Sequence, residues 1–272
     1  KKLELLQIKK LLNQRYKIKK SNLIFLVFKN KLEKINNFQN KSDWEKYQIE
    51  DTNIYTFKDI SLDINTDKKI INIFSDRSSK VIFSGGSLDG WSLNYKNQSE
   101  KNQNFIINNF KYKNINGCLS FYDININKIN IKIENSMCED ALNFVRTNGM
   151  IDKILIKNSV SDGVDFDFSN LKINSIEVYD SKNDCVDFSF GEYYVKKLNL
   201  MNCGDKSISI GETTLAQLDN INSSSSDIVL AVKDSSNVSI LNLEAEDYLK
   251  CITMYRKKTE FSGSKLKIKN DN

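Results

Sequence analysis

Carboxylate side chains recur in this chain at a regular spacing that could build an acid–base site. Asp140, Asp162 and Asp184 stand 22 residues apart, and Asp165 and Asp187 repeat the same step. If this spacing stacks them, each pair should share a proton, bind a cation or be offset by a base, because like charges repel. The bases in the same region are Arg146, Lys206 and Lys233.

Paired carboxylates of this kind could transfer protons to and from a sugar. A carboxylic acid that keeps its proton can act as a general acid while its ionised partner acts as a base, as in glycoside hydrolysis. We therefore predict Asp162 and Asp184 as acid and base, with Lys206 setting their charge. The predicted substrate-binding residues are Asp165, Asp187, Asp205 and Lys233. Ca²⁺ would suit such oxygen-rich rows, but the sequence does not define a set of metal ligands.

Two roles without catalysis would use the same residues. Asn, Asp and Ser side chains at the turns of a repeat can satisfy backbone N–H groups and do no chemistry. The same oxygen atoms could instead bind sugar hydroxyls or ions. Tyr193, Tyr194 and Tyr255 could line a sugar site or be ordinary surface residues. The alternatives are therefore a polysaccharide-binding or polysaccharide-modifying protein and a non-catalytic structural scaffold.

The absence of histidine narrows the chemistry. None of the 272 residues is a histidine, which removes the usual general base, the Ser-His-Asp and Cys-His arrangements, and the commonest metal ligand. Any catalyst must rely on Asp, Glu, Lys, Arg or Tyr. Whether the protein is an enzyme stays open; as an enzyme it would be a glycoside hydrolase or resemble a polysaccharide lyase, without histidine.

A 22-residue repeat predicts the elements that position these side chains. Six segments, each beginning 22 residues after the last, align from residue 138 to the end of the chain, and each places one central residue between two apolar ones. This alternation is typical of a strand with two side chains turned inward. The apolar columns are Leu142, Val164, Val186, Ile208, Leu230 and Ile252, and Phe144, Phe166, Phe188, Ile210, Val232 and Met254. A second strand follows in each coil, with Ile154, Ile176 and Leu198 at the same step.

Such columns are buried only when successive coils stack in parallel, about 4.8 Å apart. We therefore predict an all-β fold, a right-handed parallel β-helix of about 22 residues per coil, over residues 55–272. Residues 1–54 should form a basic N-terminal cap, with an amphipathic helix at residues 3–12. Apolar stretches at residues 23–28 and 60–64 predict strands in the region between that helix and the repeat.

The cysteines suggest no bonding pattern. Five are present, an odd number with no CxxC spacing, which indicates neither a zinc site nor a complete disulfide framework. We expect buried free thiols, because unpaired cysteine is among the most buried residue types. The five residues are Cys118, Cys138, Cys185, Cys203 and Cys251.

Charge and hydropathy suggest where the protein acts. Residues 1–50 hold 13 Lys or Arg against 5 Asp or Glu, but no interleaved aromatic residues follow, so nucleic acid is not an expected partner. The longest apolar run, residues 23–28, is too short to span a bilayer, so no transmembrane segment is expected. Because the chain begins at Lys1 and residues 1–22 are too charged for a secretory signal, we expect a fragment. Its export signal, flanking domains or partner protein would lie elsewhere, and we expect the protein to reach the cell surface, the periplasm or the exterior.

Over about residues 55–270 the chain resembles the pectin-lyase-like β-helix superfold. Its repeats are similar to those of bacterial right-handed β-helix proteins often found with spore-coat-protein-H-like kinases. The segments that carry this similarity are CEDALNF, SDGVDFDFS, NDCVDFS, GDKSISIGE and KKTEF. This resemblance implies a fold and no particular reaction.

The chain is also similar in part to polygalacturonases, which carry Asn-Thr-Asp-Gly, Asp-Asp-Cys, Gly-His-Gly and Arg-x-Lys on successive coils. The corresponding segments here are Val160–Gly163, Asn183–Cys185, Gly204–Lys206 and Ala231–Lys233. Asp162, Asp184 and Lys233 match, whereas Asn183, Asp205 and Ala231 replace a catalytic carboxylate, the histidine and the arginine. The resemblance implies a polysaccharide ligand, without implying inverting hydrolysis of polygalacturonate. Lys206 beside Asp184 and Asp205 is comparable to the base and Ca²⁺-binding cluster of lyases of the superfold.

Overall fold

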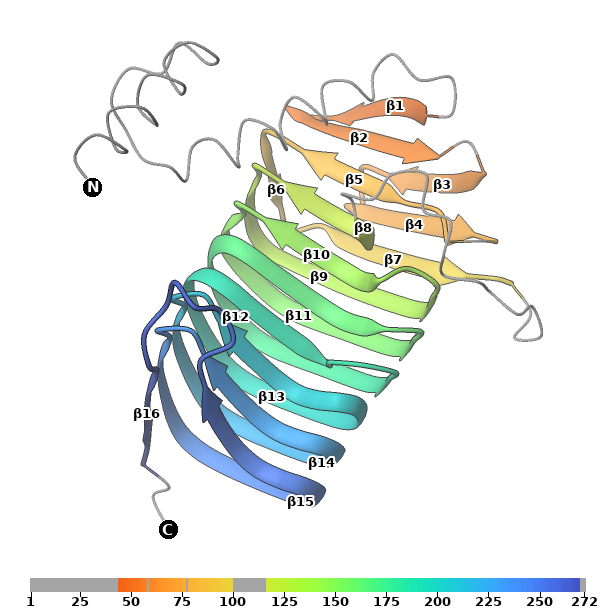
Figure 1. The fold of residues 1–272 in the computed structure, drawn as a ribbon. Helices are drawn as coiled ribbons and strands as arrows, with labels where there is room; N and C mark the ends of the chain where they lie inside the picture. Colours follow the sequence, from red (N-terminus) through yellow and green to blue (C-terminus); the bar gives the residue numbers. More distant parts are fainter. Residues whose placement is uncertain (1–43, 58, 77, 100–115, 270–272) are drawn as a thin grey trace, which may run out of the picture. The chain divides into compact units, whose positions relative to one another are not determined.

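The computed structural model describes residues 44–57, 59–76, 78–99 and 116–269, which belong to a compact unit beginning at Asp43. The regular elements within these ranges are all β-strands, and the strands join into one sheet (Figure 1). The described residues hold no helix that could cross a membrane. The predicted helix at residues 3–12 and strand at residues 23–28 lie outside the described residues, whereas the strand predicted at residues 60–64 is confirmed.

Sixteen strands make up the described part of the chain. The early ones are β1 (Trp44–Ile49), β2 (Thr52–Phe57), β3 (Ile60–Asn65), β4 (Ile70–Ser75), β5 (Val81–Ser84), β6 (Ser87–Asp89) and β7 (Ser92–Asn97). The middle ones are β8 (Gly117–Tyr122), β9 (Asn125–Ser136), β10 (Asp140–Val145) and β11 (Asn148–Ser159). The last ones are β12 (Asp162–Ser181), β13 (Val186–Gly211), β14 (Leu215–Lys233), β15 (Asn237–Tyr255) and β16 (Lys265–Ile268).

The strands stack as a parallel β-solenoid of about eight turns with about 22 residues per turn, as predicted. One face, here called the first face, contains β5, β8, β10, the opening segments of β12 and β13 and the closing segments of β13, β14 and β15. The second face contains β7, β9, β11, the later segment of β12, the middle segment of β13 and the opening segments of β14 and β15. Among the described strands, the antiparallel pairs are β1 with β2, β2 with β5 and β3 with β4. The register places Asn143, Asp165 and Asp187 side by side, because one coil equals the repeat length.

Stacked aromatic rings fill the core behind the first face. Phe121, Phe144, Phe166 and Phe188 are fully buried, and neighbouring centroids lie 4.9–5.1 Å apart. The predicted apolar columns are thus confirmed through β14. In β15, Ile252 and Met254 are 37% and 47% exposed, because among the described strands only β14 pairs with that segment.

Removing one ring from this stack should destabilise the solenoid strongly. We expect Phe166→Ala to lower the free energy of unfolding by about 3–5 kcal/mol, since it removes buried apolar surface and leaves a cavity between two rings. Urea unfolding followed by circular dichroism measures the loss. Phe74→Ala, at a partly exposed position of β4, is the control and should cost far less. Equal losses at the two positions would contradict the stacked-core account.

The cysteine prediction is wrong for four of the five residues. Cys118 bonds to Cys138 and Cys185 bonds to Cys203, with both Cα–Cα distances at 5.4 Å. Each pair is separated by 20 or 18 residues, close to one coil. The solenoid therefore brings together cysteines whose spacing in the sequence suggests no pairing. Among the described residues Cys251 is the free cysteine, and it is only partly buried.

Candidate functional site

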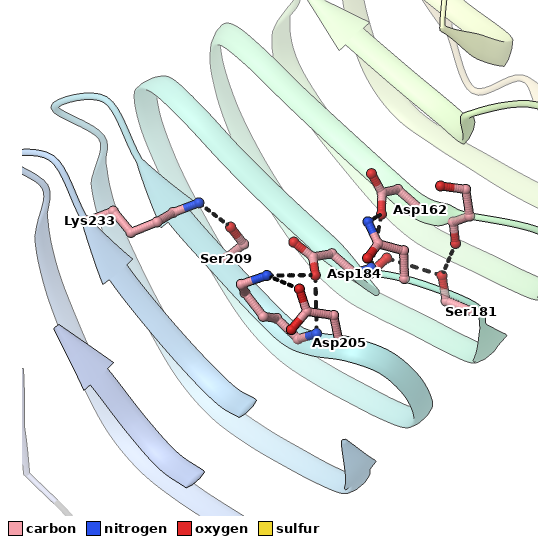
Figure 2. Close-up of polar contacts among 9 residues, drawn as sticks. Asp162, Ser181, Asp184, Asp205, Ser209 and Lys233 are labelled. Carbon is pink, nitrogen blue, oxygen red and sulfur yellow. Dashed lines mark hydrogen bonds and ion pairs between the residues drawn. The ribbon is translucent and has the colours of Figure 1, made fainter. Parts of the chain in front are cut away.

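Aspartates at the start of the first-face strands hold successive coils together (Figure 2). Asp162 Oδ1 accepts hydrogen bonds from Asn183 Nδ2 at 2.6 Å and from the backbone N–H of Asp184 at 2.9 Å. Asp184 Oδ1 in turn accepts the backbone N–H of Lys206 at 3.1 Å and its Nζ at 3.2 Å. One oxygen of each predicted catalytic carboxylate thus has the structural role that turn residues commonly play.

Burial favours the protonated form of these acids. Desolvation raises the pKa of Asp162 to about 6. It also raises the pKa of Asp184, which is 7% exposed, although the Lys206 ammonium opposes the rise. Asp140 pairs in register with Asp162, and burial followed by the charge of Asp162 raises its pKa well above the usual range. Burial therefore raises the pKa values of this row of stacked carboxylates, in the direction expected of stacked like charges.

Asp140 is buried near a lysine that was not predicted as its partner. Its side chain is 3% exposed, and no described residue donates a hydrogen bond to its Oδ2. Lys80, also 3% exposed, interacts electrostatically with Asp140, and burial lowers the pKa of this lysine to about 8. The position of Asp140 follows from the 22-residue repeat. The sequence did not indicate Lys80 as a site residue, because Lys80 precedes the regular coils.

A second row points outward from the middle of the same strands. Asn143 Nδ2 donates to Asp165 Oδ2 at 3.0 Å. Burial raises the pKa of Asp187 to about 6, against the opposing effects of Lys233 and of a hydrogen bond with Ser209. Lys233 is buried and donates from Nζ to Ser209 Oγ at 2.7 Å. Asp187 Oδ1 is buried and accepts no hydrogen bond from the described residues.

The predicted residues therefore fall into two groups on the first face. Asp162, Asp184 and Lys206 meet at the turn that enters the strands, and Asp205 joins them through an ion pair with Lys206. The other group lies along the strands and contains Asp165, Asp187 and Lys233. Both groups contain acids next to lysines. Together we call the two groups the carboxylate face. No group of three or more His, Cys, Asp or Glu side chains in the described residues could hold a metal ion.

A segment near the C-terminus, residues 256–264, returns along the turns that follow the first-face strands. The backbone N–H groups of Lys257 and Lys258 donate to Asp234 Oδ1 at 2.7 and 2.9 Å. The Lys258 ammonium pairs with Glu212, and the Phe261 ring meets the edge of Phe190 with centroids 6.3 Å apart. Sequence analysis missed this return, because its contacts link residues more than one coil apart. The segment borders the group formed by Asp187 and Lys233.

A groove on the second face was also not predicted. It has a volume of about 850 Å³, and six successive coils contribute to it. Tyr194, one of the three tyrosines considered for a sugar site, lines it as a partly exposed residue. Tyr193 is 3% exposed, and its hydroxyl donates to the carbonyl oxygen of Phe190 at 2.9 Å. Tyr255 stands on the last coil and is 41% exposed.

Comparisons with known proteins add no assignment. No protein-family model matches this chain, and neither a curated protein nor a solved structure matches it. The function is therefore argued from the geometry of the carboxylate face and of the groove.

Proposed function

We propose that this β-solenoid binds and modifies polysaccharide at the carboxylate face. The carrying observation is Asp162, a carboxylic acid with a pKa of about 6 whose Oδ1 alone takes part in the hydrogen bonds with Asn183 and Asp184. Its Oδ2 accepts no hydrogen bond from the described residues, so a proton on that oxygen can be donated to a ligand. A general acid works best when its pKa is close to the working pH.

The neighbouring residues suit the remaining roles. Asp162 would protonate the glycosidic oxygen, and Asp184, whose charged form the Lys206 ammonium stabilises, would accept a proton from the attacking water. Asp165 and Asp187 would contact sugar hydroxyls, with Asp205 and Lys233 completing the surface. This arrangement needs no histidine.

Two features support a polysaccharide ligand outside the bacterial cell. The repeats resemble those of pectin-lyase-like β-helices, and this analogy of fold raises the expectation of a polysaccharide without naming a reaction. The disulfides Cys118–Cys138 and Cys185–Cys203 fit an oxidising compartment, because disulfides persist there and are rare in the cytosol. We therefore propose that the protein acts at the cell surface, in the periplasm or in the exterior.

A non-catalytic scaffold is the second candidate, and a specific observation favours it. Asp162 and Asp184 each accept a backbone N–H group from the next coil. If that is their whole role, replacing them should change stability alone.

Asp162→Asn separates the two candidates. The amide oxygen can still accept the bonds from Asn183 and Asp184, but the side chain cannot donate an acidic proton. We expect at least a 100-fold loss of turnover, the usual scale for general-acid catalysis, with cooperative unfolding retained. The assay is release of reducing ends from polygalacturonate, xylan, mannan, β-glucan and chitin.

Asp152→Asn is the matched control, since Asp152 Oδ1 accepts Asn174 Nδ2 at 3.0 Å in a similar inter-coil bond on the second face. Its turnover should equal that of the wild type. Full activity in Asp162→Asn, or no cleavage of any polymer by the wild type, would reject the catalytic role and favour the scaffold.

A further inference from the structure

The groove on the second face is a trough between two rows of outward side chains. Strands β9 and β11 to β15 run across it, and alternate residues of a strand point to opposite sides of the sheet. One wall contains the register partners Asn170, Glu192, Leu215 and Asn237. The other contains Lys172, Tyr194, Gln217 and Ser239. Inward-turned residues between the walls, such as Leu171 and Ala216, are buried and form the floor.

The dimensions of the trough suit an extended ligand. Six coils give five steps of about 4.8 Å, so the trough is about 24 Å long, and its walls are two residues, or about 7 Å, apart. At the start of this face, two glycines allow the backbones of neighbouring coils to approach closely. A Cβ on Gly149 would lie 1.8 Å from the carbonyl oxygen of Ile126, and one on Gly191 would lie 2.2 Å from that of Ser169. Neighbouring coils could not approach this closely at either position with any other residue.

The polar groups of the trough are held in place before a ligand arrives. The Tyr194 hydroxyl donates to Asp219 Oδ2 at 2.5 Å, and Gln217 Nε2 donates to Asp219 Oδ1 at 3.2 Å. Asp219 is 9% exposed, so a buried carboxylate anchors both side chains of this wall. On the other wall, Asn170 Oδ1 accepts the backbone N–H of Glu192 at 3.2 Å. A fixed aromatic ring and fixed amides lose little conformational entropy on binding.

The chemistry of the lining excludes several ligand classes. Lys172 and Glu192 are the charged residues that line the trough, and the Asp219 carboxylate lies behind one wall, so the trough offers no row of bases for a polyanion. The β12, β13 and β14 segments that form it are paired on both sides. A peptide therefore finds no open sheet edge to extend. Amides, a hydroxyl, a tyrosine ring and the exposed Leu215 remain.

The geometry points to a binding site for a neutral, linear oligosaccharide in this trough. Sugar rings would lie on Tyr194 and Leu215, and their hydroxyl groups would contact Asn170, Gln217 and Asn237. That the ligand is a polysaccharide rests on the proposed function. The inference adds that the trough holds the polysaccharide and that the part held there is uncharged. The trough and the carboxylate face are on different faces of the coils. The trough therefore binds the oligosaccharide without supplying an acid to the reaction.

Isothermal titration calorimetry with the full chain tests the assignment. The probes are the β-1,4-linked hexasaccharides of glucose, mannose and N-acetylglucosamine, with hexagalacturonate as the charged comparison. We expect at least one neutral hexasaccharide to bind more tightly than hexagalacturonate. Tyr194→Ala should weaken that binding at least tenfold, and Gln217→Ala, which leaves the ring in place, should weaken it several-fold.

Tyr47→Ala is the matched control. Tyr47 is a 38% exposed tyrosine whose hydroxyl donates to Glu45 Oε2 at 2.7 Å, as Tyr194 does to Asp219. Its affinity should not change. Unchanged affinity in both Tyr194→Ala and Gln217→Ala, with cooperative unfolding retained, would overturn the trough assignment.

The same data separate this inference from the proposed function. If the trough variants retain binding while Asp162→Asn abolishes turnover, the trough fails alone. If the trough variants lose binding while the wild type cleaves no polymer, the trough stands and the catalytic proposal fails. Binding of no hexasaccharide by the wild type would overturn the trough assignment, and the absence of cleavage as well would overturn both.

Discussion

The free energy of unfolding should fall as the pH rises from 4 to 7. Asp162 and Asp187 have a pKa of about 6 in the folded protein against an ordinary value of 3.8. Between these values the folded state binds more protons than the unfolded state, so the stability that these two groups contribute is fully present below pH 4 and is lost as the pH passes 6. Each shift corresponds to about 3 kcal/mol at most. The raised pKa values of Asp140 and Asp184 act in the same direction.

Urea unfolding at pH 4 and pH 7 measures this effect. The double variant Asp162→Asn/Asp187→Asn should show a clearly smaller difference, because neither amide changes charge, and Asp140 and Asp184 should account for the remainder. Asp152→Asn, whose side chain lies on the second face, should keep it. A wild-type stability that is constant or rises over this interval would contradict the raised pKa values of the carboxylate face.

The second large effect is expected from the disulfide Cys185–Cys203, which closes a loop of 18 residues beside the carboxylate face. Cys185→Ala/Cys203→Ala should lower the free energy of unfolding by about 2–4 kcal/mol, since the cross-link restricts the unfolded chain. Both residues are almost fully buried, so alanine adds no polar group to the core. Reduction with dithiothreitol should destabilise the wild type at least as much, because it also opens Cys118–Cys138.

Cys251→Ala serves as the reference for this measurement. Cys251 is a free, partly buried cysteine, so its loss should change stability little and should not alter the response to dithiothreitol. If the wild type unfolds identically with and without reductant, the two cross-links do not form in solution.

Most of the fold follows from the periodicity of the sequence. The step from Phe144 to Phe166 and Phe188 predicts both the coil length and the core side chains, because apolar columns at that step have one way to become buried together. The outward position of Asp165 and Asp187 follows from the alternation of a strand. The same reasoning placed Ile252 and Met254 in the core columns, but whether such residues are covered depends on a neighbouring strand, which their own sequence does not contain.

The roles of individual polar residues needed the three-dimensional structure. The spacing alone marks Asp162 and Asp184 as stacked acids, whereas only the coordinates show that one oxygen of each binds the next coil. Asp187 and Lys233 face each other across two coils, and no motif links them.

By itself, the sequence determined the parallel solenoid, its 22-residue coil, its buried columns and the acidic character of one face. These properties depend on local alternation and on a repeat, both of which are visible along the chain. The tertiary structure alone decided the cysteine pairing, the raised pKa values of the buried acids, the return of residues 256–264 and the trough beside Tyr194. Each of these depends on distances between separate coils and on the exclusion of water, and neither quantity exists until the coils have stacked.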